Sequence, residues 1–168
     1  MNRPLAVFDV DGVLADVRHR LVHVEHRPKD WEAFFRAAVD DPPLATGVAL
    51  ALESARECEV VYVTGRPERC RADTVAWFAR HGLPEGELTM RGARDRRPAR
   101  VAKPELLRRL AADRVVAVVV DDDAQVCDAY ERAGYTVLRA DWMRDPAAPE
   151  QTTLDLLLDQ AQQEDGRT

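Results

Sequence analysis

Lysine is nearly absent from the sequence. Of its 24 basic residues only Lys29 and Lys103 are lysines, and the remainder are arginines. Lysine carries a compact, titratable ammonium group, whereas arginine stays charged and binds through a planar fork. A chain that uses arginine almost everywhere therefore marks Lys103 as a position where an ammonium group matters.

Cysteines and long apolar runs are also few. Cys58, Cys70 and Cys127 are odd in number, far apart and outside any C-x-x-C pattern. They indicate reduced, buried thiols without a catalytic role, as in a cytosolic protein. The first apolar run is broken by Asp9, so neither a signal peptide nor a membrane span fits. We expect a cytoplasmic protein with no membrane partner.

The sequence has no internal repeats and no linker-like change of composition. Its 168 residues suffice for one domain with a sizeable core, and we expect residues 1–168 to form a single domain. A net charge of −6 excludes a general nucleic-acid coat protein, although it leaves room for a local basic cleft.

Two acids end the first apolar run. Leu5 to Phe8 is typical of a buried strand, and Asp9 and Asp11 follow it, with Gly12 allowing the chain to turn. Two carboxylates this close repel each other unless a cation or a shared proton relieves them. The stretch therefore favours a hard-cation site beside an attacking carboxylate, with a surface turn as the alternative. A calcium loop is excluded because Gly12 and Arg20 occupy the wrong places for it.

Further along, apolar strand patterns alternate with helical ones. Strands are predicted at 5–8, 59–64, 88–90, 115–120 and 136–139, and helices at 31–38, 44–57, 68–81, 103–112, 124–133 and after Pro146. The unbroken apolar run at 115–120 indicates burial on both faces of a parallel sheet. The alternation predicts an α/β fold, a doubly wound (Rossmann-like) parallel sheet of about five strands, with a small helical cap insert at about 17–43.

Chemistry-bearing residues follow several of these strands. The carboxyl ends of parallel strands meet in one crevice, which here gathers Asp9, Asp11, Thr64, Arg66, Arg91, Asp121 and Asp122. Lys103 is predicted to open the intervening helix. Carboxylates in such a crevice suit Mg²⁺, which keeps waters for a substrate phosphate. With Thr64 on a phosphoryl oxygen and Lys103 neutralising charge, the arrangement predicts phosphoryl transfer to a carboxylate.

Taken in order, four stretches resemble the motifs of the haloacid dehalogenase (HAD) phosphatase superfamily, over about residues 5–140. They are Asp9-Val-Asp11-Gly12-Val-Leu, Thr64-Gly65-Arg66, Lys103 and Asp121-Asp122. The resemblance implies that Asp9 is the nucleophile and that Asp11 acts as acid and then base. It also implies that Asp9, the Asp11 carbonyl and Asp121 bind Mg²⁺ with help from Asp122.

A narrower resemblance is to the 3′-phosphatase domain of phage-type polynucleotide kinase-phosphatase. It rests on Arg20, on Gly65 and Arg66 in Thr-Gly-Arg, on Gln125-Val126 after the acid pair, and on a basic loop containing Arg91, Asp95, Arg97 and Lys103. It implies that Arg20, Gly65, Arg66, Arg91 and Arg97 bind a nucleic-acid 3′-phosphate end or a nucleotide. Ala99 and Arg100 depart from the usual acids of that loop. No kinase P-loop is present, so a separate kinase or ligase is a candidate partner.

Other interpretations stay open at this point. A phosphatase of the same superfamily acting on small metabolites fits the same motifs. A receiver-like signalling module is disfavoured, because its acceptor aspartate follows the third strand, where this chain has Met90-Arg91. His19, His23 and His26 are predicted to be solvent-facing rather than a metal site, and Trp31, Phe34 and Phe35 to pack beneath the cap.

Overall fold

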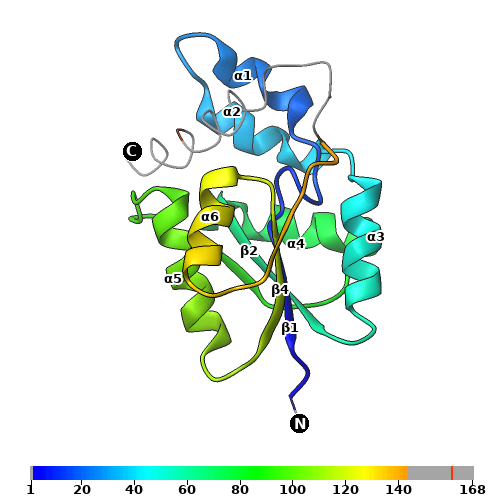
Figure 1. Cartoon of the computed structure of the whole chain (residues 1–168). Coiled ribbons are helices and arrows are strands. Elements are labelled where there is room, and N and C mark those ends of the chain that lie inside the picture. Colours follow the sequence, from blue (N-terminus) through cyan, green and yellow to red (C-terminus); the bar gives the residue numbers. More distant parts are fainter. Residues whose placement is uncertain (1, 144–159, 161–168) are drawn as a thin grey trace.

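The computed structural model describes residues 2–143 and 160, and its centre is a five-stranded, all-parallel sheet (Figure 1). The strands are β1 (Leu5–Phe8), β2 (Glu59–Pro67), β3 (Leu88–Arg91), β4 (Val116–Asp121) and β5 (Val137–Arg139). Their spatial order is β3-β2-β1-β4-β5. The doubly wound α/β prediction is confirmed, whereas the helix predicted after Pro146 falls outside the described residues.

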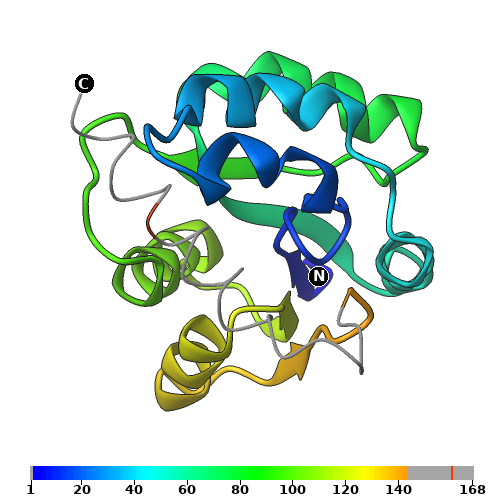
Figure 2. The ribbon, with the colours of Figure 1, turned by 90° about the horizontal axis from the view of Figure 1, so that it is seen from above.

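Helices cover both faces of this sheet, as the view from above shows (Figure 2). α3 (Ala45–Ser54) and α4 (Arg71–Arg80) lie on one face, and α5 (Ala99–Ala111) and α6 (Ala124–Arg132) lie on the other. A 3₁₀ turn, η3 (Glu68–Cys70), leads into α4. This covering on both sides is what a parallel sheet with crossover helices requires.

Alternating side chains of β1 divide the core between the two faces. Ala6 and Phe8 join an apolar cluster with residues of α3 and α4, including Ala51, Trp77 and Phe78. Leu5 and Val7 join a second cluster with residues of α5 and α6, including Leu107, Ala111, Val126 and Tyr130. The period of two along the strand explains why this short apolar run is buried on both sides.

The predicted burial of the whole 115–120 run is wrong for its first half. Val115 is 71% exposed and Ala117 is also exposed, whereas Val119 and Val120 are buried. The reason is the length of the neighbouring strand, since β5 pairs only with Val119 to Asp121. An apolar run does not reveal how far its neighbours extend.

The segment 17–43, called the cap segment below, lies over the carboxyl ends of the strands (Figure 1). It contains η1 (Arg18–Arg20), α1 (Val22–Glu25), α2 (Trp31–Arg36) and η2 (Ala37–Asp40). Phe34 and Phe35 are buried in the first apolar cluster, with Trp31 packed against it. The two ends of the segment are held together, because the Asp16 amide donates to the Pro42 carbonyl over 2.8 Å.

Gly47 lies where α3 packs against the turn after β1. A glycine inside a helix is normally improved by alanine, by about 1 kcal/mol. At Gly47, however, an added Cβ would lie 1.8 Å from the Val13 carbonyl oxygen. We expect Gly47→Ala to destabilise the protein by about 1–3 kcal/mol, measured by urea unfolding. Gly92→Ala is the control, since nothing lies within 4 Å of its added Cβ; an equal loss there would contradict this account.

Candidate active site

Three buried carboxylates meet where β1 and β4 end. Asp9, Asp121 and Asp122 each place an oxygen within 4.8 Å of the others. The sheet order produces this meeting, because Phe8 is paired with Val120 and the Asp9 amide donates to the Val120 carbonyl over 2.9 Å. We call these three residues the acidic cluster.

Lys103 bridges two members of the acidic cluster. Its Nζ lies 3.0 Å from Asp9 Oδ2 and 2.7 Å from Asp121 Oδ2, and the side chain is buried. The prediction that Lys103 opens its helix is wrong, because α5 begins at Ala99, directly after Pro98. Lys103 therefore extends from the second turn of α5. The basic loop between β3 and α5 ends at residue 98.

Burial and neighbouring charges together set the ionisation of this group. Burial raises the pKa of Asp9 to about 7, although Lys103 opposes the shift. Burial acts against the charge on Lys103, but Asp121 and Asp9 outweigh it and hold the Lys103 pKa above its usual range. The ammonium group thus stays charged between the two strand ends.

Gly12 allows Asp122 to approach the turn after β1. Its φ of +79° is a conformation that side-chain-bearing residues rarely adopt, and an added Cβ would lie 2.1 Å from Asp122 Oδ2. The amide of Leu14 donates to the Val10 carbonyl over 2.8 Å and closes the turn. Glycine is therefore required here both by the backbone and by the carboxylate beside it.

Asp11 lies in a second group of buried charges. Its Oδ1 accepts from Arg20 Nη2 over 2.9 Å and from Arg66 Nη2 over 2.7 Å. Arg20 comes from η1 in the cap segment and Arg66 from the end of β2. Although burial opposes ionisation, Arg66 and Arg20 outweigh it and lower the Asp11 pKa to about 2. Asp11 is therefore a carboxylate in this arrangement.

Sequence reasoning missed Asp41, the acid that completes this second group. Asp41 is 2% exposed and accepts hydrogen bonds from both Arg20 and Arg66. In the sequence it stands before Pro42-Pro43, where an acid reads as part of a helix end. No spacing relates it to Asp11, so only the folded chain reveals it.

The remaining predicted site residues lie near the carboxyl ends of the strands or on the basic loop that follows β3. Thr64 is buried and its hydroxyl accepts from the Arg66 amide over 3.1 Å, with Gly65 between them in β2. Arg91 Nε donates to the Asp95 carbonyl over 2.7 Å, and Arg97 pairs with Asp95 and Glu105. Arg91 and Arg97 thus shape the loop, and their binding of substrate stays a prediction.

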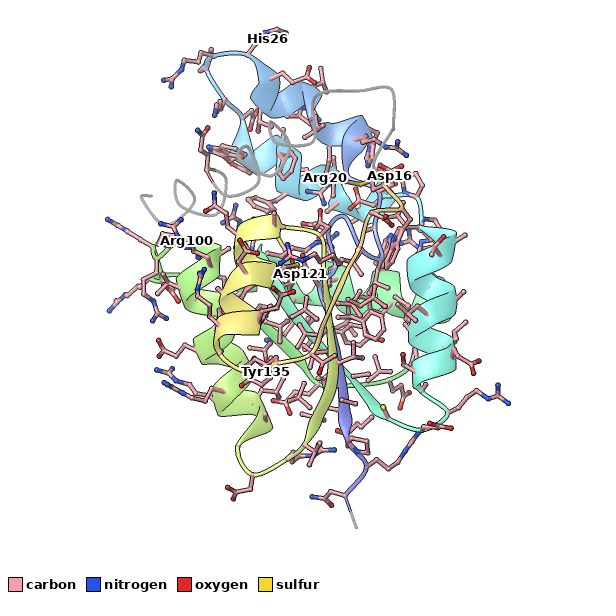
Figure 3. The ribbon with its side chains drawn as sticks, in the orientation of Figure 1. Asp16, Arg20, His26, Arg100, Asp121 and Tyr135 are labelled. Carbon is pink, nitrogen blue, oxygen red and sulfur yellow. The ribbon has the colours of Figure 1, made fainter. Side chains whose placement is uncertain are left out.

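The histidines do not gather into a metal site within the described chain. His19 Nε2 lies 2.8 Å from Asp41 Oδ1, while His26 is exposed at the far end of the cap segment (Figure 3). Figure 3 also shows Arg20 on the lower side of the cap segment and Asp121 beneath it in the body of the protein. Across residues 2–143, no helix is long and apolar enough to span a membrane.

The charges of the two groups differ in a way that bears on metal binding. Asp11 and Asp41 balance Arg20 and Arg66. The three carboxylates of the acidic cluster, when ionised, exceed the one ammonium group of Lys103 by two negative charges. Carboxylate oxygens are hard ligands that suit Mg²⁺. The donor set and the charge excess of the acidic cluster therefore fit a divalent cation.

The fold and the order of these groups define a class. A parallel doubly wound sheet with Asp-x-Asp after its first strand, threonine after the second and an acid pair after the fourth is that of a HAD phosphatase. Residues 4–142 match the family described as the polynucleotide kinase PNKP phosphatase domain, and the chain belongs to this family. The resemblance inferred from the sequence is confirmed.

Solved structures share the fold at low sequence identity. A chain of the Pnkp1/Rnl/Hen1 RNA repair complex matches with a TM-score of 0.61 and 19% identity over 82% of this chain, and a second structure of the complex with 0.67 and 22% over 82%. This chain spans 42% and 46% of those two chains. The magnesium-bound HAD-hydrolase YfnB from Bacillus subtilis matches with a TM-score of 0.58 and 9% identity, covering 84% of this chain and 90% of its own. No curated protein matches the sequence.

The two lysines allow a matched test of the acidic cluster. We expect Lys103→Gln to lower the free energy of unfolding by about 3–5 kcal/mol, because Asp9 and Asp121 lose their buried partner. Lys29→Gln removes only a half-buried lysine that bonds Gln160, and we expect a loss of about 1 kcal/mol or less. Urea unfolding of both variants without added divalent cation gives the comparison. Equal losses would contradict the bridging role of Lys103.

Proposed function

We propose that the chain is a magnesium-dependent phosphomonoester hydrolase that works through an aspartyl-phosphate and acts on nucleic-acid 3′-phosphate ends or nucleotides. The observation that carries the proposal is the acidic cluster bridged by Lys103 next to Asp11. Asp9, Asp121, Asp122 and the Asp11 carbonyl would hold the ion. When bound, Mg²⁺ supplies positive charge that attracts the substrate phosphate and offsets charge in the transition state.

Asp9 is the nucleophile in this proposal. Its Oδ2 faces Lys103, whereas no hydrogen bond from the described chain falls on its Oδ1. This oxygen attacks phosphorus while the bond from phosphorus to the leaving oxygen breaks, which leaves a phosphoryl group on Asp9. Lys103 neutralises negative charge beside it, and the hydroxyl of Thr64 binds a phosphoryl oxygen.

Asp11 is the general acid and base in this proposal. As the carboxylate seen here, it accepts a proton from the water that hydrolyses the aspartyl-phosphate. Its earlier role, protonating the leaving oxygen, requires the protonated form, which Arg20 and Arg66 oppose while both contact Oδ1. The proposal therefore includes a shift of these guanidinium groups toward the substrate phosphates when the substrate binds.

The surroundings of the site support a substrate with an accessible end. We assign residues 17–43 as a small cap on a single domain, and its few short helices make a modest cover. Arg94 and Arg96 are exposed on the neighbouring loop, and Arg100 is exposed in the first turn of α5, where Figure 3 labels it. These charges favour a phosphate-rich polymer in the cytoplasm over a small metabolite, which is the second candidate. The RNA repair complexes among the similar structures favour a separate kinase or ligase partner.

We expect Asp9→Asn to reduce phosphate release by at least about a thousandfold while the protein stays folded, because an amide cannot attack phosphorus. Circular dichroism and a phosphate-release assay with Mg²⁺ measure the two properties. Acid quenching of the wild-type reaction, followed by peptide mass spectrometry, is expected to place one phosphoryl group on Asp9. Asp16→Asn is the control, since among the described residues the Asp16 carboxylate bonds only its neighbour Arg18. Full activity of Asp9→Asn would refute the assigned nucleophile.

A substrate panel separates the two candidate substrate classes. We expect the highest kcat/KM with 3′-phosphorylated oligonucleotides, lower values with 3′- and 5′-mononucleotides, and the lowest with sugar phosphates, because only a polymer reaches the exposed arginines. Chelation of the divalent cation is expected to abolish turnover, and added Mg²⁺ to restore it. A preference for sugar phosphates would transfer the assignment to the small-metabolite candidate.

A further inference from the structure

The segment that follows β5 has no part in the proposed chemistry, although it bonds two strand ends of the site. We call residues 140–143 the strap. The Ala140 amide donates to the Asp121 carbonyl over 2.9 Å. Two residues later, Trp142 Nε1 donates to the Val13 carbonyl over 2.8 Å. In Figure 1 the strap lies in the orange stretch that rises toward the cap segment. One short segment therefore bonds both the end of β4 and the turn after β1.

The turn that accepts the Trp142 bond also carries a proposed ligand of the cation. The Asp11 carbonyl lies in this turn, two residues before Val13. The turn is closed by its own bonds, since the Leu14 amide donates to the Val10 carbonyl over 2.8 Å. A displacement of the Val13 carbonyl is therefore transmitted to the Asp11 carbonyl through a short, closed stretch of backbone.

The Val13 carbonyl is enclosed from two sides. A Cβ added at Gly47 would lie 1.8 Å from this oxygen and 3.3 Å from Trp142 Nε1, so the carbonyl lies between α3 and the strap. Trp142 is half-buried and packs against the first apolar cluster, and Met143 after it is buried in a third cluster with Val17. These contacts fix the indole ring and hence the direction of its N–H group.

The strap opposes the repulsion within the acidic cluster. When ionised, the three carboxylates exceed the one ammonium group of Lys103 by two negative charges. Like charges favour separation of the strand ends that carry them. Asp121 ends β4 and Asp9 precedes the turn after β1, and the strap has one bond on each side of this division. It therefore limits how far the two halves of the site can separate before a cation binds.

The size of the cation decides what such a restraint does to affinity. Mg²⁺ is small and demands near-ideal octahedral geometry, whereas Ca²⁺ accepts larger and more variable arrangements of oxygen ligands. Holding the two halves of the site together in advance lowers the cost of assembling a small site, which is how preorganisation raises affinity. A looser site loses this advantage for Mg²⁺ and loses little for Ca²⁺.

We propose that Trp142 is a positioning residue, which holds the turn after β1 against the end of β4 and so favours Mg²⁺ over Ca²⁺ in the cation site. The inference rests on the proposed function in one respect, the assignment of the acidic cluster and the Asp11 carbonyl as ligands. Among the described residues the Trp142 indole bonds the Val13 carbonyl and no group of the acidic cluster. It therefore acts through the backbone of the turn.

The test compares Trp142→Phe, which retains an aromatic ring and loses the N–H donor, with Trp31→Phe, which changes a half-buried tryptophan of the cap segment. Isothermal titration calorimetry of the full chain with MgCl₂ alone and CaCl₂ alone gives the dissociation constants. We expect Trp142→Phe to weaken Mg²⁺ binding by roughly 5–20-fold and Ca²⁺ binding by about twofold or less. We expect Trp31→Phe to leave both unchanged. Unchanged Mg²⁺ binding in Trp142→Phe, or equal weakening of the two ions, would overturn the proposal.

A second measurement separates positioning from a general loss of stability. A cation that binds only the folded protein raises the unfolding temperature by an amount that depends on its affinity. A purely structural role would lower the Tm of Trp142→Phe by the same amount with and without MgCl₂. We expect instead that MgCl₂ raises the Tm of Trp142→Phe less than that of the wild type, while CaCl₂ raises both alike. An equal rise with MgCl₂ would refute the positioning role.

Gly47→Ala keeps the test decisive should Trp142→Phe not fold. The added Cβ displaces the same Val13 carbonyl from the side of α3 and retains the indole donor. We expect Gly47→Ala to weaken Mg²⁺ binding more than Ca²⁺ binding. A folded Gly47→Ala protein with wild-type affinity for both ions would overturn the proposal.

The calorimetry is independent of turnover, so the two proposals can fail separately. If Mg²⁺ binding depends on Trp142 as expected but the wild type releases phosphate from no phosphomonoester, the proposed function fails and the positioning role stands. If the wild type releases phosphate and Mg²⁺ binding is the same in Trp142→Phe, the positioning role fails and the proposed function stands.

Discussion

The bridge from Lys103 to Asp9 and Asp121 is the interaction on which the arrangement of the site depends. Carboxylates buried at adjacent strand ends repel one another, and each is costly to remove from water. One ammonium group within 3.0 Å of both makes this proximity tolerable without neutralising the acidic cluster. Lys103 comes from α5, which connects β3 to β4. The helix and the two strands that end in Asp9 and Asp121 must therefore pack correctly for the bridge to form.

Sheet order explains why these groups meet. β1 lies between β2 and β4, so the acids that follow it are flanked by the end of β2 on one side and the end of β4 on the other. Arg66 reaches Asp11 from β2, and Asp121 reaches Asp9 from β4. Because Asp9 and Asp11 are separated by one residue and followed by the turn at Gly12, each serves a different neighbour. The group of Asp11, Asp41, Arg20 and Arg66 and the acidic cluster thus lie on either side of the end of one strand.

The sequence was sufficient to predict that the site lies at the carboxyl ends of the strands, and to predict most of the residues there. Apolar runs ending in acids located Asp9, Asp11 and Asp121, and an isolated lysine marked Lys103. It was insufficient where partners are chosen by tertiary packing. Asp41 lacks any periodic or motif signal, and nothing in the sequence indicates that Arg20 and Arg66 both contact Asp11. The exposed first half of β4 has the same origin, because a strand's pattern does not encode the length of its neighbour.

The two buried groups of charged residues differ in net charge. The group of Asp11, Asp41, Arg20 and Arg66 is electrically balanced, because its two carboxylates pair with its two guanidinium groups. The acidic cluster carries an excess of two negative charges when ionised, so its full ionisation at neutral pH calls for a divalent cation. The site therefore combines a balanced group of charges around Asp11 with an acidic cluster whose excess negative charge can attract a cation. That division follows from which side chains the sheet order brings together, and it leaves the uncompensated negative charge on Asp9, Asp121 and Asp122.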